Sequence, residues 1–186
     1  MPLTLPDALS PVAAHRGGRV VVTTMSSVGA WPAFSDGPKD FAYLPSSMGQ
    51  GIPLGLGLAL AKPGLGVVVV SGDGGLLMNL GCLVTLAQHA VPVCVVLIDN
   101  GLYEVTGGQP VAGAGRTDFA GLARASGIRD VWACDTLAEW QRVAPAALAT
   151  AGPAFVALKV EPRYGMATPT APRPMAEQIA RLRAAL

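Results

Sequence analysis

The sequence predicts an α/β fold: a three-layer, doubly wound, mostly parallel sheet with helices on both faces. Residues 67–70 and 91–98 are apolar runs rich in β-branched side chains, typical of strands buried on both faces. Between them, residues 76–87 carry apolar side chains at helical spacing. A right-handed crossover through that helix makes the two strands parallel neighbours. Their carboxyl ends then meet at the sheet edge where open α/β sheets bind ligands.

The chain before residue 67 supplies a further strand and a glycine-rich helix. That helix contains Gly55 and Gly57, each of which costs about 1 kcal/mol relative to alanine in a helix interior. We therefore expect both glycines to mark close backbone packing. The predicted elements are, in order, an N-terminal arm over 1–18 with a short helix from Asp7, a strand over 19–24, a polar loop over 25–29, an extended segment over 41–44 and a helix from Gln50 to Ala61.

The chain after residue 100 opens with a glycine-rich loop and closes with a proline-rich tail over 161–186. We expect residues 1–186 to form one domain. The predicted elements are a helix from Asp118 to Ala125, a short strand over 131–133, a helix over 137–150, a strand over 154–160 and a final helix whose apolar face carries Met175, Ile179, Leu182 and Leu186.

The composition favours a protein that buries much of its surface. Of the 186 residues, 51% are hydrophobic and only 13% are charged, against about 25% charged in an average domain. We therefore expect subunit interfaces. The net charge is +1 without a basic run, which argues against nucleic acid as a partner.

The cysteines and the N-terminus point to a cytoplasmic protein. Cys82, Cys94 and Cys134 are odd in number, lack metal-ligand spacing and lie in apolar stretches, so we expect buried, reduced thiols. No signal peptide is visible. Residues 74–98 contain no Asp, Glu, Lys or Arg, which would also suit a membrane span. Polar residues and Pro92 interrupt that run, so a helix followed by a buried strand explains it better.

Asp73 and Asn100 follow the two central strands, at the same edge of the predicted sheet. Carboxylate and amide oxygens suit Mg²⁺, which keeps positions for waters and substrate phosphates. Gly74 and Gly75 leave the backbone bare where the helix starts, and backbone N–H groups at such a start favour a diphosphate. Taken singly, Asp73 could be a helix cap and Asn100 an Asx turn.

These residues carry a family resemblance. Gly72-Asp73-Gly74 and, after residues 75–99, Asn100 resemble the diphosphate–metal motif of thiamine diphosphate (ThDP) enzymes. Residues 44–51, Leu-Pro-Ser-Ser-Met-Gly-Gln-Gly, resemble the turn that contacts the cofactor's pyrimidine. Residues 99–109 resemble the sulfopyruvate and phosphonopyruvate decarboxylases. The likeness covers roughly residues 19 to 160 and implies the diphosphate-binding domain of the family.

The resemblance also assigns roles to residues. It makes Asp73, Asn100 and the backbone carbonyl of Leu102 the Mg²⁺ ligands, and Met48 an apolar wedge under the bent cofactor. Where Gly75 stands the family often has a hydroxyl residue, and where Ser46 stands it commonly has glycine. The residues expected to contact the cofactor are Ser26, Ser46, Ser47, Met48, Gly72, Asp73, Gly74, Gly75, Asn100, Leu102 and Tyr103.

Several of these residues also have plainer interpretations. Met48 could be a core methionine, and Ser26 and Ser27 could belong to an ordinary polar loop. The segment with Tyr103, Glu104, Thr106 and Gln109 could line the substrate approach or be an exposed loop.

The resemblance further implies a partner. A glutamate of a separate pyrimidine-binding domain activates ThDP in the family, and none of the four glutamates here lies in such a motif: Glu104, Glu139, Glu161 and Glu177. We therefore expect no catalytic residue in this chain and a pyrimidine-binding (α) subunit that completes the site, in a hetero-oligomer or through pairing of this domain. The predicted function is the β-type subunit of a ThDP-dependent decarboxylase of a small 2-oxoacid, sulfopyruvate or phosphonopyruvate.

Three alternatives stay open at this point. The first is a subunit of another ThDP enzyme, such as an acetolactate-synthase-like carboligase or an oxoacid oxidoreductase. The second is a non-catalytic nucleotide-binding module, because Gly55-Leu56-Gly57 resembles a dinucleotide fingerprint; Leu60 stands where its third glycine belongs. The third is a degenerate ThDP subunit without activity.

Overall fold

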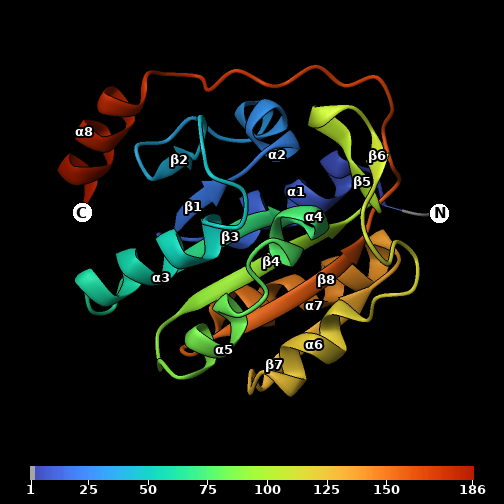
Figure 1. The fold of residues 1–186 in the computed structure, drawn as a ribbon. Coiled ribbons are helices and arrows are strands. Elements are labelled where there is room, and N and C mark those ends of the chain that lie inside the picture. The colour runs from blue at the N-terminus through green and yellow to red at the C-terminus, as the bar shows by residue number, and fades with distance from the viewer. Residues whose placement is uncertain (1–2) are drawn as a thin grey trace.

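The computed structural model describes residues 3–186 and contains a six-stranded sheet in the order β2-β1-β3-β4-β8-β7. Every pair of neighbouring strands in it is parallel. Helices cover both faces of the sheet (Figure 1), which confirms the predicted fold class. The strands are β1 (Val20–Thr23), β2 (Asp40–Ala42), β3 (Val67–Gly72), β4 (Val93–Asp99), β7 (Asp130–Cys134) and β8 (Ala154–Lys159), and a separate hairpin pairs β5 (Leu102–Tyr103) with β6 (Gln109–Pro110).

The central strands β3 and β4 are buried on both faces, as their β-branched runs predict. Their register pairs Val70 with Val96 and Gly72 with Ile98. Asp73 therefore lies directly after the carboxyl end of β3, and Asn100 lies directly after the carboxyl end of β4. The fold brings the two predicted ligands to one edge.

One face of the sheet is covered by α1 (Leu5–His15) and α7 (Leu137–Ala149). Each helix starts with a capping box, formed by Thr4 with Asp7 and by Thr136 with Glu139. The Trp140 side chain is fully buried, and its Nε1 donates to the Ala8 carbonyl at 2.9 Å. The residues predicted as an arm thus contain a buried helix that starts at Leu5; Met1 and Pro2 lie outside the described residues.

The other face is covered by α3 (Gly51–Ala61), α5 (Cys82–Ala87), α6 (Phe119–Ala125) and α8 (Met175–Ala185). A Cβ atom on Gly55 would overlap the Val69 side chain, so the close packing expected there is confirmed. Gly57 has open space where a side chain would point, so the same expectation is wrong for Gly57. That face of α3 is turned away from the sheet.

Two further local predictions are wrong. The helix predicted over 76–87 is broken into α4 (Asp73–Leu77) and α5 by a turn in which the Asn79 Nδ2 donates to the Gly49 carbonyl at 3.2 Å. The polar loop predicted over 25–29 is instead the short helix α2 (Ser26–Ala30), followed by the 3₁₀ turn η1 (Trp31–Ala33).

The predicted apolar face of α8 is confirmed at three of its four residues. Leu182 is buried, and Met175 and Leu186 pack against the same core, whereas Ile179 is 42% exposed. The buried side also includes Gln178, which is 5% exposed and whose Oε1 accepts the backbone N–H of Ala42 in β2 at 2.8 Å.

Two further expectations were that the cysteine thiols are buried and reduced, and that residues 74–98 do not form a membrane-spanning helix. All three cysteines are free and buried, and burial raises the pKa of Cys94 to about 12. Within residues 3–186, no helix combines the length and the apolar character needed to cross a membrane.

Candidate cofactor and metal site

A pocket lies at the carboxyl ends of β1, β3 and β4, where α2, α4 and the loop after β4 meet. It holds about 490 Å³ of empty space, including open solvent at its mouth. Its lining contains most of the residues predicted for the cofactor. The lining residues are Leu5, Thr24, Met25, Ser26, Ser27, Met48, Ser71, Gly72, Asp73, Gly74, Gly75, Ile98, Asn100, Leu102, Tyr103, Glu104, Val105 and Thr106.

Asp73 is a buried carboxylate, with only 2% of the residue exposed. Its two oxygens accept the backbone N–H groups of Gly74 and Gly101, each at 2.7 Å. Burial raises the pKa of Asp73 to about 6, although these two hydrogen bonds act to lower it. Within residues 3–186, no Lys, Arg or His nitrogen lies within 4.0 Å of this carboxylate. A buried charge without a counter-ion is the feature that a bound cation would satisfy.

Asn100 lies beside Asp73 in the same lining, on the loop that Asp73 holds through Gly101. Its Oδ1 accepts the N–H of Leu102 at 3.0 Å, so the Asx turn of the plainer interpretation is present. An amide oxygen has a second lone pair, which leaves it able to bind a metal as well.

The donor set fits Mg²⁺ better than a transition metal. No group of three or more His, Cys, Asp or Glu side chains gathers anywhere in the described part of the chain. Asp73, Asn100 and the Leu102 carbonyl offer three oxygens, and Mg²⁺ accepts so few protein ligands because it retains waters and binds substrate phosphates.

Gly74 is needed because of the Tyr103 side chain. A Cβ atom on Gly74 would overlap the Tyr103 ring, which lies against the start of α4. Gly75 has no contact that close: a Cβ atom there would lie 3.6 Å from the Ser71 Oγ. The first glycine is thus fixed by packing, whereas the second leaves room at the pocket wall.

The turn before α3 brings only one of its three predicted residues into the pocket. Met48 lines it, whereas Ser46 and Ser47 do not. The Ser46 Oγ is buried without a hydrogen-bond partner among the described residues. Gly49 holds the turn against α4 with φ 83°, and a Cβ atom there would lie 2.9 Å from the Asn79 Cβ.

The segment after β1 contributes hydroxyls that sequence reasoning placed in a loop. Met25 is the one non-glycine residue among 3–186 with a positive φ, at 47°, a strained conformation of the kind found at functional sites. Ser27 fixes this turn, since its Oγ donates to the Thr24 carbonyl at 2.7 Å. The Ser26 Oγ instead donates to the Glu104 Oε2 at 2.7 Å. Its single proton is used there, so this hydroxyl can offer a ligand in the pocket only an acceptor.

Glu104 is 5% exposed and is held by groups from both ends of the chain. Besides Ser26, it accepts the backbone N–H of Arg163 at 2.9 Å and the Arg163 Nη2 at 3.0 Å. Burial alone raises the pKa of Glu104, but these hydrogen bonds outweigh burial and keep the pKa below its ordinary value. Tyr103 and Thr106 line the pocket with Glu104, whereas Gln109 lies outside the lining and is exposed.

The pocket is acidic. Its lining contains two carboxylates, Asp73 and Glu104, and no Lys, Arg or His. Arg163 contacts the lining residue Glu104, and this ion pair neutralises the Arg163 charge. An anionic ligand in this pocket therefore needs a cation that this set of side chains does not supply.

Comparisons with known proteins decide the family. Residues 38–158 match the family model described as "Thiamine pyrophosphate enzyme, C-terminal TPP binding domain". The chain belongs to the thiamine pyrophosphate enzymes. Thiamine pyrophosphate is another name for thiamine diphosphate, so the family's cofactor is the one that the motif predicted.

Two named relatives are similar at the level of sequence. The chain is 40% identical over 148 residues to a phosphonopyruvate decarboxylase of Streptomyces viridochromogenes, covering 79% of this chain and 36% of that protein. It is 41% identical over 128 residues to the sulfopyruvate decarboxylase subunit beta of Methanothermobacter thermautotrophicus, covering 68% of this chain and 65% of that protein. The chain thus spans about a third of the first relative and about two thirds of the second.

A solved structure supports the fold alone. The benzoylformate decarboxylase of Polynucleobacter necessarius matches 91% of this chain with a TM-score of 0.75 and 19% sequence identity, over 35% of its own length.

Proposed function

We propose that this chain binds the diphosphate of ThDP together with Mg²⁺ at the Asp73–Asn100 edge, as one subunit of a 2-oxoacid decarboxylase. The observation that carries this proposal is the Asp73 carboxylate, which is buried and without a side-chain cation in a pocket of the thiamine pyrophosphate fold. A divalent cation would neutralise Asp73 and the diphosphate at once.

The residues of the pocket divide the work of holding the cofactor. Asp73, Asn100 and the Leu102 carbonyl would hold Mg²⁺, and the backbone at Gly74 and Gly75 would lie against the diphosphate. Met48, which also lines the pocket, would support the bent cofactor. Bound ThDP supplies an electron sink for the electrons left when CO₂ departs, and the protein supplies binding and orientation.

We also propose a pyrimidine-binding partner that brings the activating glutamate. Of the four glutamates, Glu139 caps α7, while Glu161 and Glu177 are exposed. Glu104 reaches the pocket, but it lies beside Ser26 and is paired with Arg163. The relatives named as subunit beta support a two-subunit arrangement. Pairing between copies of this domain is compatible with that arrangement.

The compartment that we propose for the protein is the cytoplasm.

The proposed substrate is a small 2-oxoacid with a second anionic group, of the sulfopyruvate or phosphonopyruvate kind. The names of the relatives support this class. Because Glu104 neutralises Arg163, the cation that binds the second anionic group would come from the partner.

The test is an assay of the purified complex of this chain with a pyrimidine-binding subunit. Release of CO₂ and of the matching aldehyde from phosphonopyruvate or sulfopyruvate, dependent on ThDP and Mg²⁺ and lost in Asp73→Ala, is the expected result. A condensed hydroxy-oxoacid as the main product would contradict the decarboxylase proposal and favour a carboligase.

A further inference from the structure

The Glu104 carboxylate joins three segments that are far apart in the sequence. It lies on η2 (Glu104–Thr106), directly after the proposed metal loop. Its donors are Ser26, which precedes the matched domain of residues 38–158, and Arg163, which follows it. Two segments outside the matched range of residues 38–158 thus meet on one buried side chain at the cofactor pocket.

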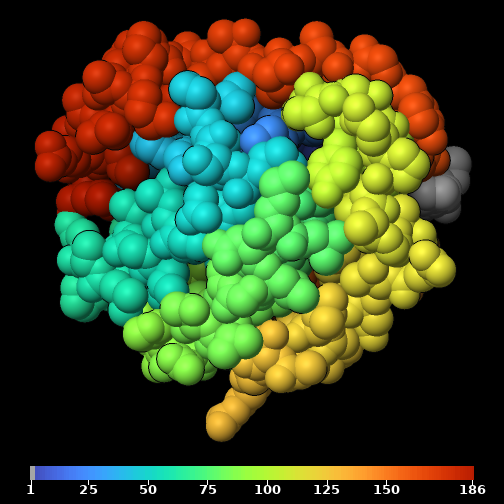
Figure 2. Space-filling view, in the orientation of Figure 1, coloured from blue at the N-terminus to red at the C-terminus, as the bar shows by residue number. Residues whose placement is uncertain are grey.

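The tail is attached to the loop at a second point. The Thr168 Oγ1 donates to the Val105 carbonyl at 3.0 Å. Figure 2 shows this tail, orange to red, running along the edge of the molecule past the yellow segment that contains the loop. Residues 163–168 therefore lie against η2 as a strap, and the loop with Asn100 and Leu102 is held between that strap and Asp73.

We propose that Glu104 and Arg163 form a latch that positions the metal loop for the cofactor. This inference rests on the proposed function. Glu104 acts as a positioning residue: it fixes the Ser26 hydroxyl and ties the loop to the tail. Arg163 has a second task, because it neutralises a buried carboxylate beside the place where an anionic diphosphate would bind.

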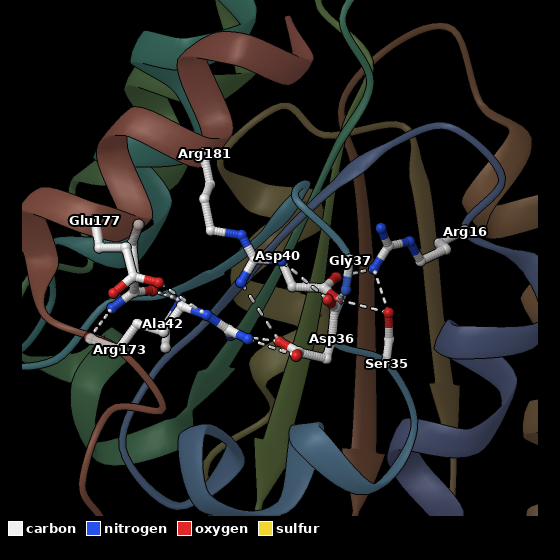
Figure 3. A network of polar contacts seen from close by, with 10 residues as sticks. Arg16, Ser35, Asp36, Gly37, Asp40, Ala42, Arg173, Glu177 and Arg181 are labelled. Carbon is white, nitrogen blue, oxygen red and sulfur yellow. Dashed lines mark hydrogen bonds and ion pairs between the residues drawn. The ribbon is translucent and has the colours of Figure 1, made fainter.

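The chain provides a matched control for this latch. Asp40 is a largely buried carboxylate that is likewise held by one serine, one arginine and one backbone N–H: Ser35 Oγ at 2.5 Å, Gly37 N at 2.7 Å and Arg16. Figure 3 shows these groups converging on Asp40. Asp40 lines a different depression and does not reach the cofactor pocket. The kinds of donor are the same at both sites, whereas the position relative to the pocket differs.

The experiment compares Glu104→Gln with Asp40→Asn in the full chain, purified with its pyrimidine-binding partner. ThDP is titrated calorimetrically in excess Mg²⁺, and the thermal midpoint is measured on the same samples. Both variants should lower the midpoint by similar amounts. Glu104→Gln should weaken ThDP binding at least tenfold, and Asp40→Asn less than twofold. Equal affinities of the two variants, with the wild type binding normally, would overturn the latch.

The charge of the pair gives a second readout that a purely structural role would not produce. Arg163→Met leaves the Glu104 carboxylate without its cation, so it should weaken ThDP binding more than Glu104→Gln does. The double variant Glu104→Gln/Arg163→Met should then bind ThDP more tightly than Arg163→Met alone. A double variant that binds no better than Arg163→Met would contradict the proposal, whereas failure of the wild type to bind ThDP would contradict the proposed function itself.

Discussion

The central part of the chain, residues 38–158, and its two flanks are built differently. The centre carries the strands β3 and β4 with Asp73 and Asn100, and its core is made of apolar contacts. The flanks contribute β1, α1, α2 and α8. They share the apolar core, and each of the three helices is also joined to the centre by at least one polar contact that is buried or largely buried. The difference teaches that the centre carries the predicted metal ligands, while the N-terminal flank completes the pocket wall with Leu5 and residues 24–27.

These joints between flank and centre are not equivalent. Trp140 with Ala8, Arg16 with Asp40 and Gln178 with Ala42 lie away from the pocket. Arg163 with Glu104 reaches it. We therefore expect changes at the first three joints to alter stability alone, and the predictions below test that separation in order of decreasing effect.

Trp140→Ala should have the largest effect on stability. The side chain is fully buried between α7 and α1, and truncating a buried tryptophan costs about 3–5 kcal/mol. Trp140→Phe, which keeps most of the volume but loses the bond to the Ala8 carbonyl, should cost about 1 kcal/mol. Denaturant unfolding measures both. A loss below about 1 kcal/mol for Trp140→Ala would mean that α1 is not part of the core.

Gln178→Leu should cost about 1–3 kcal/mol, because the Ala42 N–H would be left buried without an acceptor. The loss should be local to α8 and β2. Hydrogen exchange at the Ala42 amide reports it directly, with the Ala123 amide of α6 as the internal control. Faster exchange at both amides to the same extent would show that α8 is not a separately attached flank.

Thr4→Ala should have the smallest effect, about 1 kcal/mol, because it removes one capping box. The effect should depend on pH. A side-chain and a backbone hydrogen bond from Thr4 hold the pKa of Asp7 below its ordinary 3.8, so the cap stabilises the fold above that value and loses its contribution as the pH falls through the folded-state pKa. The difference between wild type and Thr4→Ala should therefore shrink below pH 3.8; a constant difference from neutral to acid pH would contradict this account of the cap.

Much of the centre could be predicted from the sequence because its signals are local. The β-branched runs and the glycine-rich helix over 51–61 each show their period within a few residues, and Gly72-Asp73-Gly74 follows a strand directly. The break between α4 and α5 was missed because its cause, the contact of Asn79 with Gly49, is distant in sequence.

The strand β1 and the helix α8 of the flanks were predicted, but the polar contacts that join the flanks to the centre were missed for the same physical reason. The pairing of Arg163 with Glu104 joins residues that are 59 positions apart and has no local pattern. The start of α1 did have a local signal. Thr4 and Asp7 have the spacing of a capping box, which indicates a helix that begins directly after Thr4 rather than at Asp7. The exposed side of Gly57 depends on which face of α3 meets the sheet, and composition alone does not contain that information.

The most direct measurement is a calorimetric titration of ThDP into the complex of this chain with its partner, in Mg²⁺ and in chelator. Asp73→Asn keeps the shape and removes the charge, while Asp40→Asn is the control, because Asp40 is a largely buried carboxylate that lines a different depression and stays outside the pocket lining. We predict saturable, Mg²⁺-dependent binding by the wild type and Asp40→Asn, and binding at least a hundredfold weaker by Asp73→Asn. Equal, Mg²⁺-independent binding by all three proteins would contradict the metal and cofactor site at Asp73 and Asn100.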